Sequence, residues 1–336
     1  MGGDALQPRV LPCREREPAE GDGKEEGEKR ENDHGYGLLL GGGAPDSTLQ
    51  PTGPDAILRG VADRGAILDV GLIRVDDGAS WEPATDAVAV EAALEVRLNG
   101  QPFSVTMRTP GADRELAAGF LFTEGIVTAA ADVLAVHVDP LAGIVDVILT
   151  ADRAARVAAQ RDARRQVTTT SSCGMCGRPD LASTRLTAPR VAPTRPVTAA
   201  AIRDLPARLA PLQETFAATG GLHAAALCTL DGDIVDTAED VGRHNAVDKI
   251  IGRRLLAGRL PAGDTLLFVS GRTSFEILQK AWLAGVPLVA AVSAPSSLAI
   301  ELAEEAGITL IGFVRGSRFN IYTHPSRVAQ AAVSHG

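Results

Sequence analysis

The sequence predicts an α/β protein with two folded domains and a disordered N-terminal tail. Strand-like and helix-like segments alternate between Thr265 and Phe313, which indicates a parallel sheet covered by helices. Apolar runs rich in Val, Ile and Leu recur between turn signals from Ala66 to Leu149. Residues 1–55 show no apolar periodicity. A chain of 336 residues with 45% hydrophobic content is long enough to bury two cores.

The predicted domain boundaries follow from changes in composition along the chain. Residues 1–55 are rich in Gly, Pro, Glu and Asp, which is typical of a disordered tail. We expect a small α+β domain over residues 56–166, a dithiol loop and linker over 167–197, and a three-layer αβα domain over 198–330. Four prolines fall in the linker, where they exclude regular helix and central strand.

The small domain is predicted to contain strands around one helix. The strands are expected at Ala66–Val75, Ala87–Leu98, Pro102–Met107, Val133–Val138 and Ile144–Leu149. Asn99-Gly100 is a hairpin signal, because both residues tolerate positive φ. A helix is expected with Asp113 as its N-cap and Gly125 at its end, and a basic helix over Ala151–Arg165 leads into the linker.

The C-terminal domain begins with a helix over Thr198–Thr219, interrupted by its prolines, and then an antiparallel strand pair. The elements that follow are expected at Arg243–Leu256 (helix), Thr265–Val269 (strand), Thr273–Leu283 (helix), Pro287–Val292 (strand), Ser296–Ala306 (helix) and Ile308–Phe313 (strand). This order matches the cytidine deaminase architecture, so the predicted fold class is α/β with a cytidine deaminase-like αβα domain.

Composition and charge argue against several classes of function. A net charge of -9 and a pI near 5.2 argue against general nucleic-acid binding, which needs a basic surface. No apolar run reaches the roughly 18 residues that span a bilayer. Four irregularly spaced cysteines and a start without a signal-peptide pattern point to a reducing cytoplasm.

Cys173 and Cys176 form a Cys-x-x-Cys stretch flanked by Thr, Ser and Gly, which favours a mobile reactive loop. Such a pair serves persulfide transfer, redox chemistry or half of a zinc site. A zinc deaminase site is not indicated, because the helix starts at Arg243 and Thr273 carry no cysteine. Cys228 lies in an apolar strand and is expected in the core, so we expect no tightly bound metal.

Loops rich in Ser, Gly and Arg follow the predicted parallel strands. They are Ser270–Ser274, Ser293–Ser297 and Arg315–Arg318, and Asp240–Asn245 opens the preceding helix. Parallel strands place such loops at one edge of the sheet, beside helix N-termini that bind phosphate. We therefore expect a phosphorylated, nucleotide-like ligand, although pairing of Arg243 with Asp240 or Glu239 is an alternative. No Walker A or Gly-x-Gly-x-x-Gly sequence is present.

The chain resembles the FdhD (FdhD/NarQ) family of formate dehydrogenase accessory sulfurtransferases from about Ala66 to Val328. The segments that carry the resemblance are Thr109-Pro110, Glu115–Gly125, Cys173–Gly177, Glu239–Lys249, Ser270-Gly271-Arg272, Gly312–Gly316 and Asn320-Ile321-Tyr322.

The resemblance implies an enzyme that carries sulfur from a cysteine desulfurase to the molybdenum (or tungsten) bis(molybdopterin guanine dinucleotide) cofactor of the formate dehydrogenase catalytic subunit. It implies a persulfide on Cys173, assistance by Cys176, and a homodimer. The cofactor would be bound by the stretch Phe313, Val314, Arg315, Gly316, Ser317 and Arg318, joined by Arg272 from the phosphate edge. The alternative is a non-catalytic cofactor-binding chaperone with a structural zinc or dithiol loop.

Overall fold

The computed structural model describes residues 65–76, 80–163, 186, 188–192 and 194–329. These residues belong to one compact unit of the chain, Pro51–Gly336. The predicted tail of residues 1–55 and the dithiol stretch Ser171–Gly177 lie outside the described residues.

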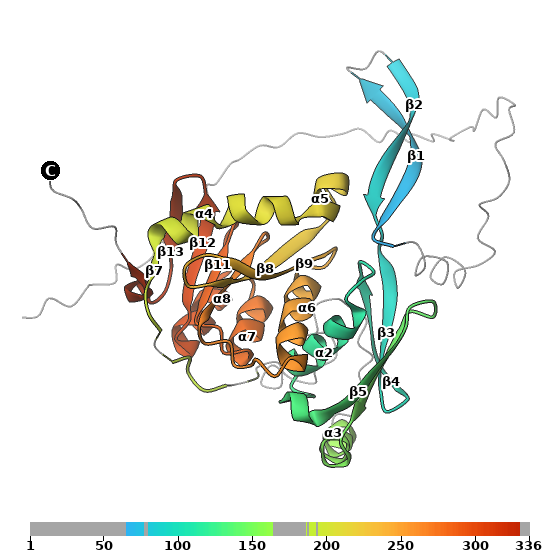
Figure 1. The fold of residues 1–336 in the computed structure, drawn as a ribbon, viewed down its shortest axis with the longest axis vertical. Coiled ribbons are helices and arrows are strands. Elements are labelled where there is room, and N and C mark those ends of the chain that lie inside the picture. Colours follow the sequence, from blue (N-terminus) through green and yellow to red (C-terminus); the bar gives the residue numbers. More distant parts are fainter. Residues whose placement is uncertain (1–64, 77–79, 164–185, 187, 193, 330–336) are drawn as a thin grey trace, which may run out of the picture. The chain divides into compact units, whose positions relative to one another are not determined.

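A four-stranded sheet forms the first part of the fold (Figure 1), with the strand order β4-β3-β6-β5. Its strands are β3 (Ala92–Leu98), β4 (Gln101–Arg108), β5 (Val133–Asp139) and β6 (Ile144–Leu149). Helices α2 (Asp113–Thr123) and α3 (Ala151–Ala163) pack against this sheet, and a 3-10 turn lies at Ala130–Asp132. The predicted hairpin turn is confirmed, because Asn99 and Gly100 have φ values of 50° and 79°.

The start of α2 differs from the expectation that Asp113 is its N-cap. Ala112 holds the cap position with a φ of 54°, and Asp113 is the first helical residue. The Asp113 carboxylate is used elsewhere, because it forms a buried, two-pronged ion pair with Arg108 at 2.8 and 2.9 Å. Asp113 therefore predicted the start of the helix correctly, but it is not the capping residue.

Two antiparallel strands, β1 (Ile67–Asp76) and β2 (Ser80–Ala89), pair only with each other in the described sheets. The single strand expected over Ala87–Leu98 is therefore two strands, one ending at Ala89 and the next beginning at Ala92. The apolar alternation continues across the break, so periodicity alone does not reveal that the chain changes partners there.

A six-stranded sheet forms the second part, with the order β13-β12-β11-β10-β8-β9. Its strands are β8 (His223–Thr229), β9 (Ile234–Asp240), β10 (Thr265–Val269), β11 (Leu288–Ala291), β12 (Thr309–Arg315) and β13 (Arg318–Ile321). The expected parallel pairing holds for β10, β11 and β12. Strands β8 and β13 pair antiparallel with this central group, and β9 pairs antiparallel with β8.

Helices cover both faces of this sheet (Figure 1). Helices α6 (Arg243–Leu256), α7 (Phe275–Leu283) and α8 (Ser297–Ala306) bury their apolar residues on one face, and α4 (Ala199–Leu209) on the other. The helix expected over Thr198–Thr219 is interrupted as predicted, since a 3-10 turn at Ala210–Leu212 separates α4 from α5 (Glu214–Thr219). The short strands β7 (Val197–Thr198) and β14 (Val328–Ala329) pair in parallel near a 3-10 turn at Pro325–Arg327.

The mixed α/β class is thus confirmed, while the specific likeness to cytidine deaminases stays a prediction. Among the described helices, none is long and apolar enough to cross a membrane.

Candidate functional site

One edge of the six-stranded sheet gathers the loops singled out in the sequence. The parallel strands β10, β11 and β12 all end there. Strand β8 runs the other way, so its first residue, His223, lies at the same edge opposite Asp240 of β9. Helices α6, α7 and α8 begin just after the strands that end there, which places their free N–H groups at the edge.

Backbone hydrogen bonds join neighbouring loops at this edge. The N–H of Thr273 donates to the carbonyl of Ala294 at 3.2 Å, and the N–H of Ser296 donates to the carbonyl of Thr273 at 3.0 Å. The N–H of Phe313 donates to the carbonyl of Ser293 at 3.2 Å. The loops after β10 and β11 and the end of β12 therefore form one connected rim.

The predicted cofactor-binding stretch forms the end of β12, the turn and the start of β13. Phe313 has a φ of 55° at an irregularity in the β12–β13 pairing, which re-aims the backbone next to the rim. Val314 is 1% exposed and packs in the core, whereas Arg315, Gly316, Ser317 and Arg318 are exposed at the turn. Arg315 donates from Nε to the carbonyl of Val292 at 3.0 Å, and its guanidinium lies 5.6 Å from the Phe313 ring centroid. The hairpin thus presents two cationic side chains to solvent.

Arg272 is exposed in the loop between β10 and α7 and forms no ion pair within the described ranges. The alternative pairing considered for Arg243 is not present either. Asp240 forms an ion pair with Lys249 at 2.8 Å instead. Glu239 accepts hydrogen bonds from the backbone N–H groups of Thr215 and Phe216 at the start of α5.

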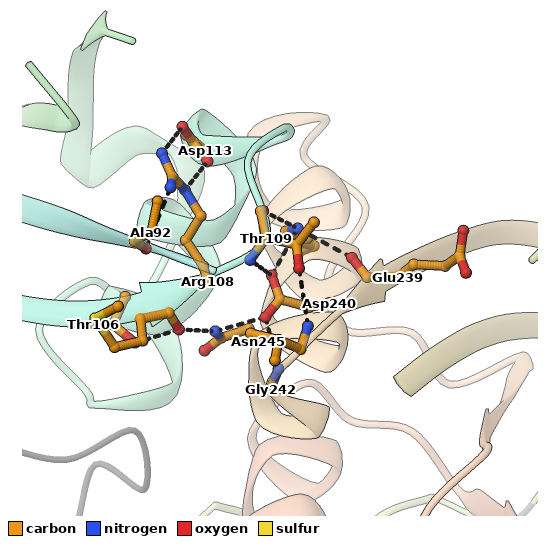
Figure 2. Close-up of polar contacts among 12 residues, drawn as sticks. Ala92, Thr106, Arg108, Thr109, Asp113, Glu239, Asp240, Gly242 and Asn245 are labelled. Atoms are coloured by element: carbon orange, nitrogen blue, oxygen red, sulfur yellow. Dashed lines mark hydrogen bonds and ion pairs between the residues drawn. The ribbon is translucent and has the colours of Figure 1, made fainter. Parts of the chain in front are cut away.

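The buried carboxylate of Asp240 holds the start of α6 against the loop that follows β4 (Figure 2). Its Oδ1 accepts bonds from the backbone N–H of Gly242 at 2.8 Å and from Nδ2 of Asn245 at 2.9 Å. Its Oδ2 accepts a bond from the N–H of Thr109 at 3.2 Å and contacts Nζ of Lys249. A carboxylate with this many donors is fully satisfied, which makes it a structural clamp.

Lys249 completes this clamp. Its Nζ also donates to the carbonyls of Thr109 and Glu239, each at 3.1 Å. An ammonium group has three donors, so Lys249 keeps none for a ligand. Much of the stretch Glu239–Lys249 therefore fixes the position of α6. Sequence reasoning missed this role because Thr109 lies 140 positions from Lys249 in the chain.

The first turn of α6 also brings His244 to the start of α7. Its Nε2 lies 3.3 Å from Oγ of Ser274 and 3.3 Å from Oε2 of Glu276. The hydroxyl of Ser274 donates to the same carboxylate oxygen at 2.5 Å. The hydrogen bond from His244 lowers the pKa of Glu276 to about 2, against the opposing effect of its burial. Glu276 was not identified from the sequence, where nothing links it to position 244.

His223 was also missed. Burial lowers its pKa, and the charges of Arg243, His244 and Arg272 lower it further, while Asp240 raises it. These neighbours come from three separate elements of the edge. No local pattern points to His223, because only the reversed direction of β8 brings its first residue to the end of β10.

A pocket of about 230 Å³ lies beside the clamp, lined by residues that include Thr109, Glu239, Lys249 and Arg253. Its cations are already paired, since Lys249 contacts Asp240 and Arg253 contacts Asp236 at 2.5 Å. The rim of the sheet is therefore a better candidate for binding an anion than this pocket.

Cys228 is fully buried in β8, as predicted, and burial raises the pKa of its thiol to about 12. Within the described ranges, no group of three or more His, Cys, Asp and Glu side chains is arranged to hold a metal ion. Cys173 and Cys176, the predicted sulfur-carrying residues, lie outside those ranges.

Comparison with known proteins identifies the family. The model of the FdhD/NarQ family matches residues 89–329. The sulfur carrier protein FdhD of Streptomyces coelicolor is 49% identical over 289 residues, covering 79% of this chain and 97% of that protein. The sulfur carrier protein FdhD of Mycobacterium tuberculosis is 47% identical over 254 residues, covering 72% and 92%. A crystal structure of a formate dehydrogenase accessory protein from Desulfotalea psychrophila shares the fold, with a TM-score of 0.62 at 23% identity over 79% of this chain and 100% of that one. This chain belongs to the FdhD/NarQ family.

Proposed function

We propose that this chain is a sulfurtransferase. It would accept sulfur from a cysteine desulfurase as a persulfide on Cys173 and deliver it to the molybdenum bis(molybdopterin guanine dinucleotide) cofactor of formate dehydrogenase. The observation that supports this most is the 49% identity to a sulfur carrier protein over 79% of the chain, a match that spans 97% of that relative.

The rim of the sheet supports the acceptor side of the proposal. Guanine dinucleotide ends carry pyrophosphates. The rim offers the exposed guanidinium groups of Arg272 and Arg318 beside helix N-termini, and neither forms an ion pair within the described ranges. The guanidinium of Arg315 lies next to the Phe313 ring, so the hairpin combines charge with an aromatic surface. On this proposal the hairpin and Arg272 bind the cofactor while the dithiol supplies the sulfur.

The loading of Cys173 with sulfur is a thiol exchange that needs no oxidant. The Cys173 thiolate attacks the outer sulfur of the desulfurase persulfide, so the donor S–S bond breaks, a new S–S bond forms on Cys173, and the donor thiolate leaves. In the release step the Cys176 thiolate attacks Cys173, and the outer sulfur passes to the acceptor at the hydrosulfide level. The resulting disulfide needs a cellular dithiol reductant before the next cycle.

The proposal also covers the partner proteins, the cellular compartment and the fold of the C-terminal domain. The partners are a cysteine desulfurase, the catalytic subunit of formate dehydrogenase and a second copy of this chain in a homodimer. The reaction takes place in the cytoplasm, and the C-terminal αβα domain has a cytidine deaminase-like architecture.

Mass spectrometry of the intact protein tests the persulfide. After incubation with a cysteine desulfurase and cysteine, the wild type should gain about 32 Da, and a thiol reductant should remove the added sulfur. The Cys173→Ala variant should gain nothing, while the matched control Cys13→Ala should gain the same mass as the wild type. A full gain by Cys173→Ala, or no gain by the wild type while the desulfurase itself is loaded, would refute the proposal.

A further inference from the structure

Strand β1 has an outer edge that no other strand covers in the described part of the chain (Figure 1), where it pairs with β2 alone. Just outside this ribbon, the N–H of Val90 donates to the carbonyl of Ala66 at 2.9 Å. Because hydrogen-bonded and non-hydrogen-bonded positions alternate in an antiparallel pair, even-numbered residues of β1 bond to β2 and odd-numbered residues face outward. The outward-facing backbone groups of β1 therefore belong to Ile67, Asp69, Gly71, Ile73 and Val75.

The outer edge of β2 is interrupted by a proline. By the same alternation, Pro83 lies at an outward-facing position of β2, opposite Ile73 of β1. Proline has no N–H, so it breaks the row of donors, which is one way that natural edge strands avoid pairing with another chain. Strand β1 spans 10 residues and contains neither proline nor lysine. Of the two edges of this ribbon, that of β1 is therefore the one open to a further strand.

The side chains of β1 are apolar on both faces of the ribbon. Ile67 and Ile73 are 39% and 54% exposed on one face. Leu68, Val70 and Leu72 alternate with them on the other face, where they are half-buried. A two-stranded ribbon is marginally stable by itself in water. A strand paired along β1 would add backbone hydrogen bonds and cover apolar surface on both faces.

The sequence of β1 reads nearly the same in both directions about Val70. In Ile67-Leu68-Asp69-Val70-Gly71-Leu72-Ile73, leucine stands two residues and isoleucine three residues to either side of that valine. Two copies of β1 paired antiparallel about Val70 would oppose isoleucine to isoleucine, leucine to leucine and valine to valine. Asp69 would oppose Gly71, so no carboxylate directly opposes another. This register also pairs outward-facing residues with outward-facing residues, as an antiparallel ladder requires.

We propose that β1 pairs antiparallel with β1 of a second copy of this chain, which joins two β1–β2 ribbons into one four-stranded sheet with its two-fold axis at Val70. Both copies then use the same self-complementary surface, as a two-fold dimer requires. The choice of a second copy as occupant rests on the homodimer of the proposed function. The surface and the register rest on the open edge and the near-palindromic sequence of β1.

A cysteine at position 70 tests the axis. Opposed residues at a non-hydrogen-bonded position have Cα atoms about 4.5 Å apart, within the roughly 4.4 to 6.8 Å that a disulfide spans. Mild oxidation of the full-length Val70→Cys variant should therefore link two copies through residue 70. Peptide mass spectrometry distinguishes this bond from bonds made by the native cysteines.

Leu72→Cys is the matched control, because it lies on the same face of the same strand. In the proposed register its two copies are four residues apart along the strand, about 14 Å at about 3.4 Å per residue, so they should not form a disulfide. A mixture of Leu68→Cys and Leu72→Cys proteins should cross-link, since the register opposes these two positions.

Sedimentation equilibrium of the full-length protein measures the association itself. The wild type should be a dimer at micromolar concentration. Val70→Lys should raise the dissociation constant by about tenfold or more, because it opposes two ammonium groups at the axis. Ala84→Lys is the matched control, since it adds the same charge on the same face of the ribbon but on β2, opposite Leu72. Circular dichroism confirms that each variant is folded.

Three results would each overturn the proposal. They are a monomeric wild type, a folded Val70→Lys variant that dimerises as tightly as Ala84→Lys, and equal cross-linking of Val70→Cys and Leu72→Cys. Sulfur loading of Cys173 is measured separately by the mass gain. Loss of sulfur loading in a protein that still pairs through β1 contradicts the proposed function alone, and normal loading in a protein that does not pair contradicts this interface alone.

Discussion

Gly119 of α2 and Gly252 of α6 face each other where the two helices cross, with no room for a side chain on either. A Cβ atom on Gly252 would lie 2.8 Å from the backbone nitrogen of Gly119 and closer still to the carbonyl oxygen of Glu115. Helix α2 packs in the core of the four-stranded sheet, and α6 packs on the six-stranded sheet. The crossing therefore joins the two sheets through direct backbone contact.

The first prediction is that Gly252→Ala destabilises the fold by about 3 kcal/mol, the upper end of typical overpacking costs. In an open helix the same change would stabilise by about 1 kcal/mol, so the sign itself is informative. Urea unfolding followed by circular dichroism measures the change. Gly263→Ala is the control, because nothing lies within 4 Å of its added Cβ. Equal unfolding midpoints for the two variants would contradict the close crossing.

The second prediction compares two ion pairs with similar geometry and different burial. Arg108 and Asp113 form a two-pronged pair in which Arg108 is fully buried. Asp113→Ala leaves that guanidinium without its carboxylate and should cost about 3 to 5 kcal/mol of unfolding free energy. Arg195 and Asp231 form a two-pronged pair with side chains 54% and 68% exposed.

Asp231→Ala removes the carboxylate of this exposed pair. It should leave the free energy of unfolding unchanged within error, because solvent already screens that pair. Equilibrium denaturation of both variants under the same conditions checks the contrast. If the two variants lose equal stability, burial does not decide the strength of these pairs.

Much of the fold could be predicted from local pattern. The bounds of α6 and β10 follow from apolar spacing, and the Asn99-Gly100 turn follows from its tolerance of positive φ. The break between β2 and β3 could not be predicted, because it reflects a change of pairing partner rather than a change of local pattern.

The candidate site was predictable to the same extent. Ser, Gly and Arg at strand ends placed Arg272 and the Arg315–Arg318 hairpin at one edge of the sheet. The structural use of Asp240 and Lys249 depends on contacts with Thr109, which lies 131 and 140 positions away. No local signal encodes such a contact. The sequence pattern of Glu239–Lys249 therefore does not show which of its residues are structural and which are available to a ligand.

The third prediction concerns acid stability. The hydrogen bond from His244 holds the pKa of Glu276 at about 2, below its ordinary value of 4.5. A carboxyl with a lowered folded-state pKa stabilises the fold fully above pH 4.5 and loses that contribution as the pH falls toward 2. The stability advantage of the wild type over Glu276→Gln should therefore be constant from pH 7 to about 5 and then shrink. Urea unfolding at a series of pH values measures it, and an advantage that is unchanged at pH 3 would refute the assignment.

The fourth prediction separates Cys228 from the cysteines proposed to carry sulfur. Burial raises the pKa of the Cys228 thiol to about 12, so almost no thiolate exists at pH 8 and no alkylating reagent reaches it in the folded chain. Iodoacetamide at pH 8 should leave the Cys228 peptide unmodified in the native protein and modify it completely in 6 M guanidinium, as peptide mass spectrometry can show. Rapid native labelling at Cys228 would mean that β8 opens readily. In that case this thiol would compete for persulfide sulfur, and a mass gain on the whole protein would no longer identify Cys173 without peptide mapping.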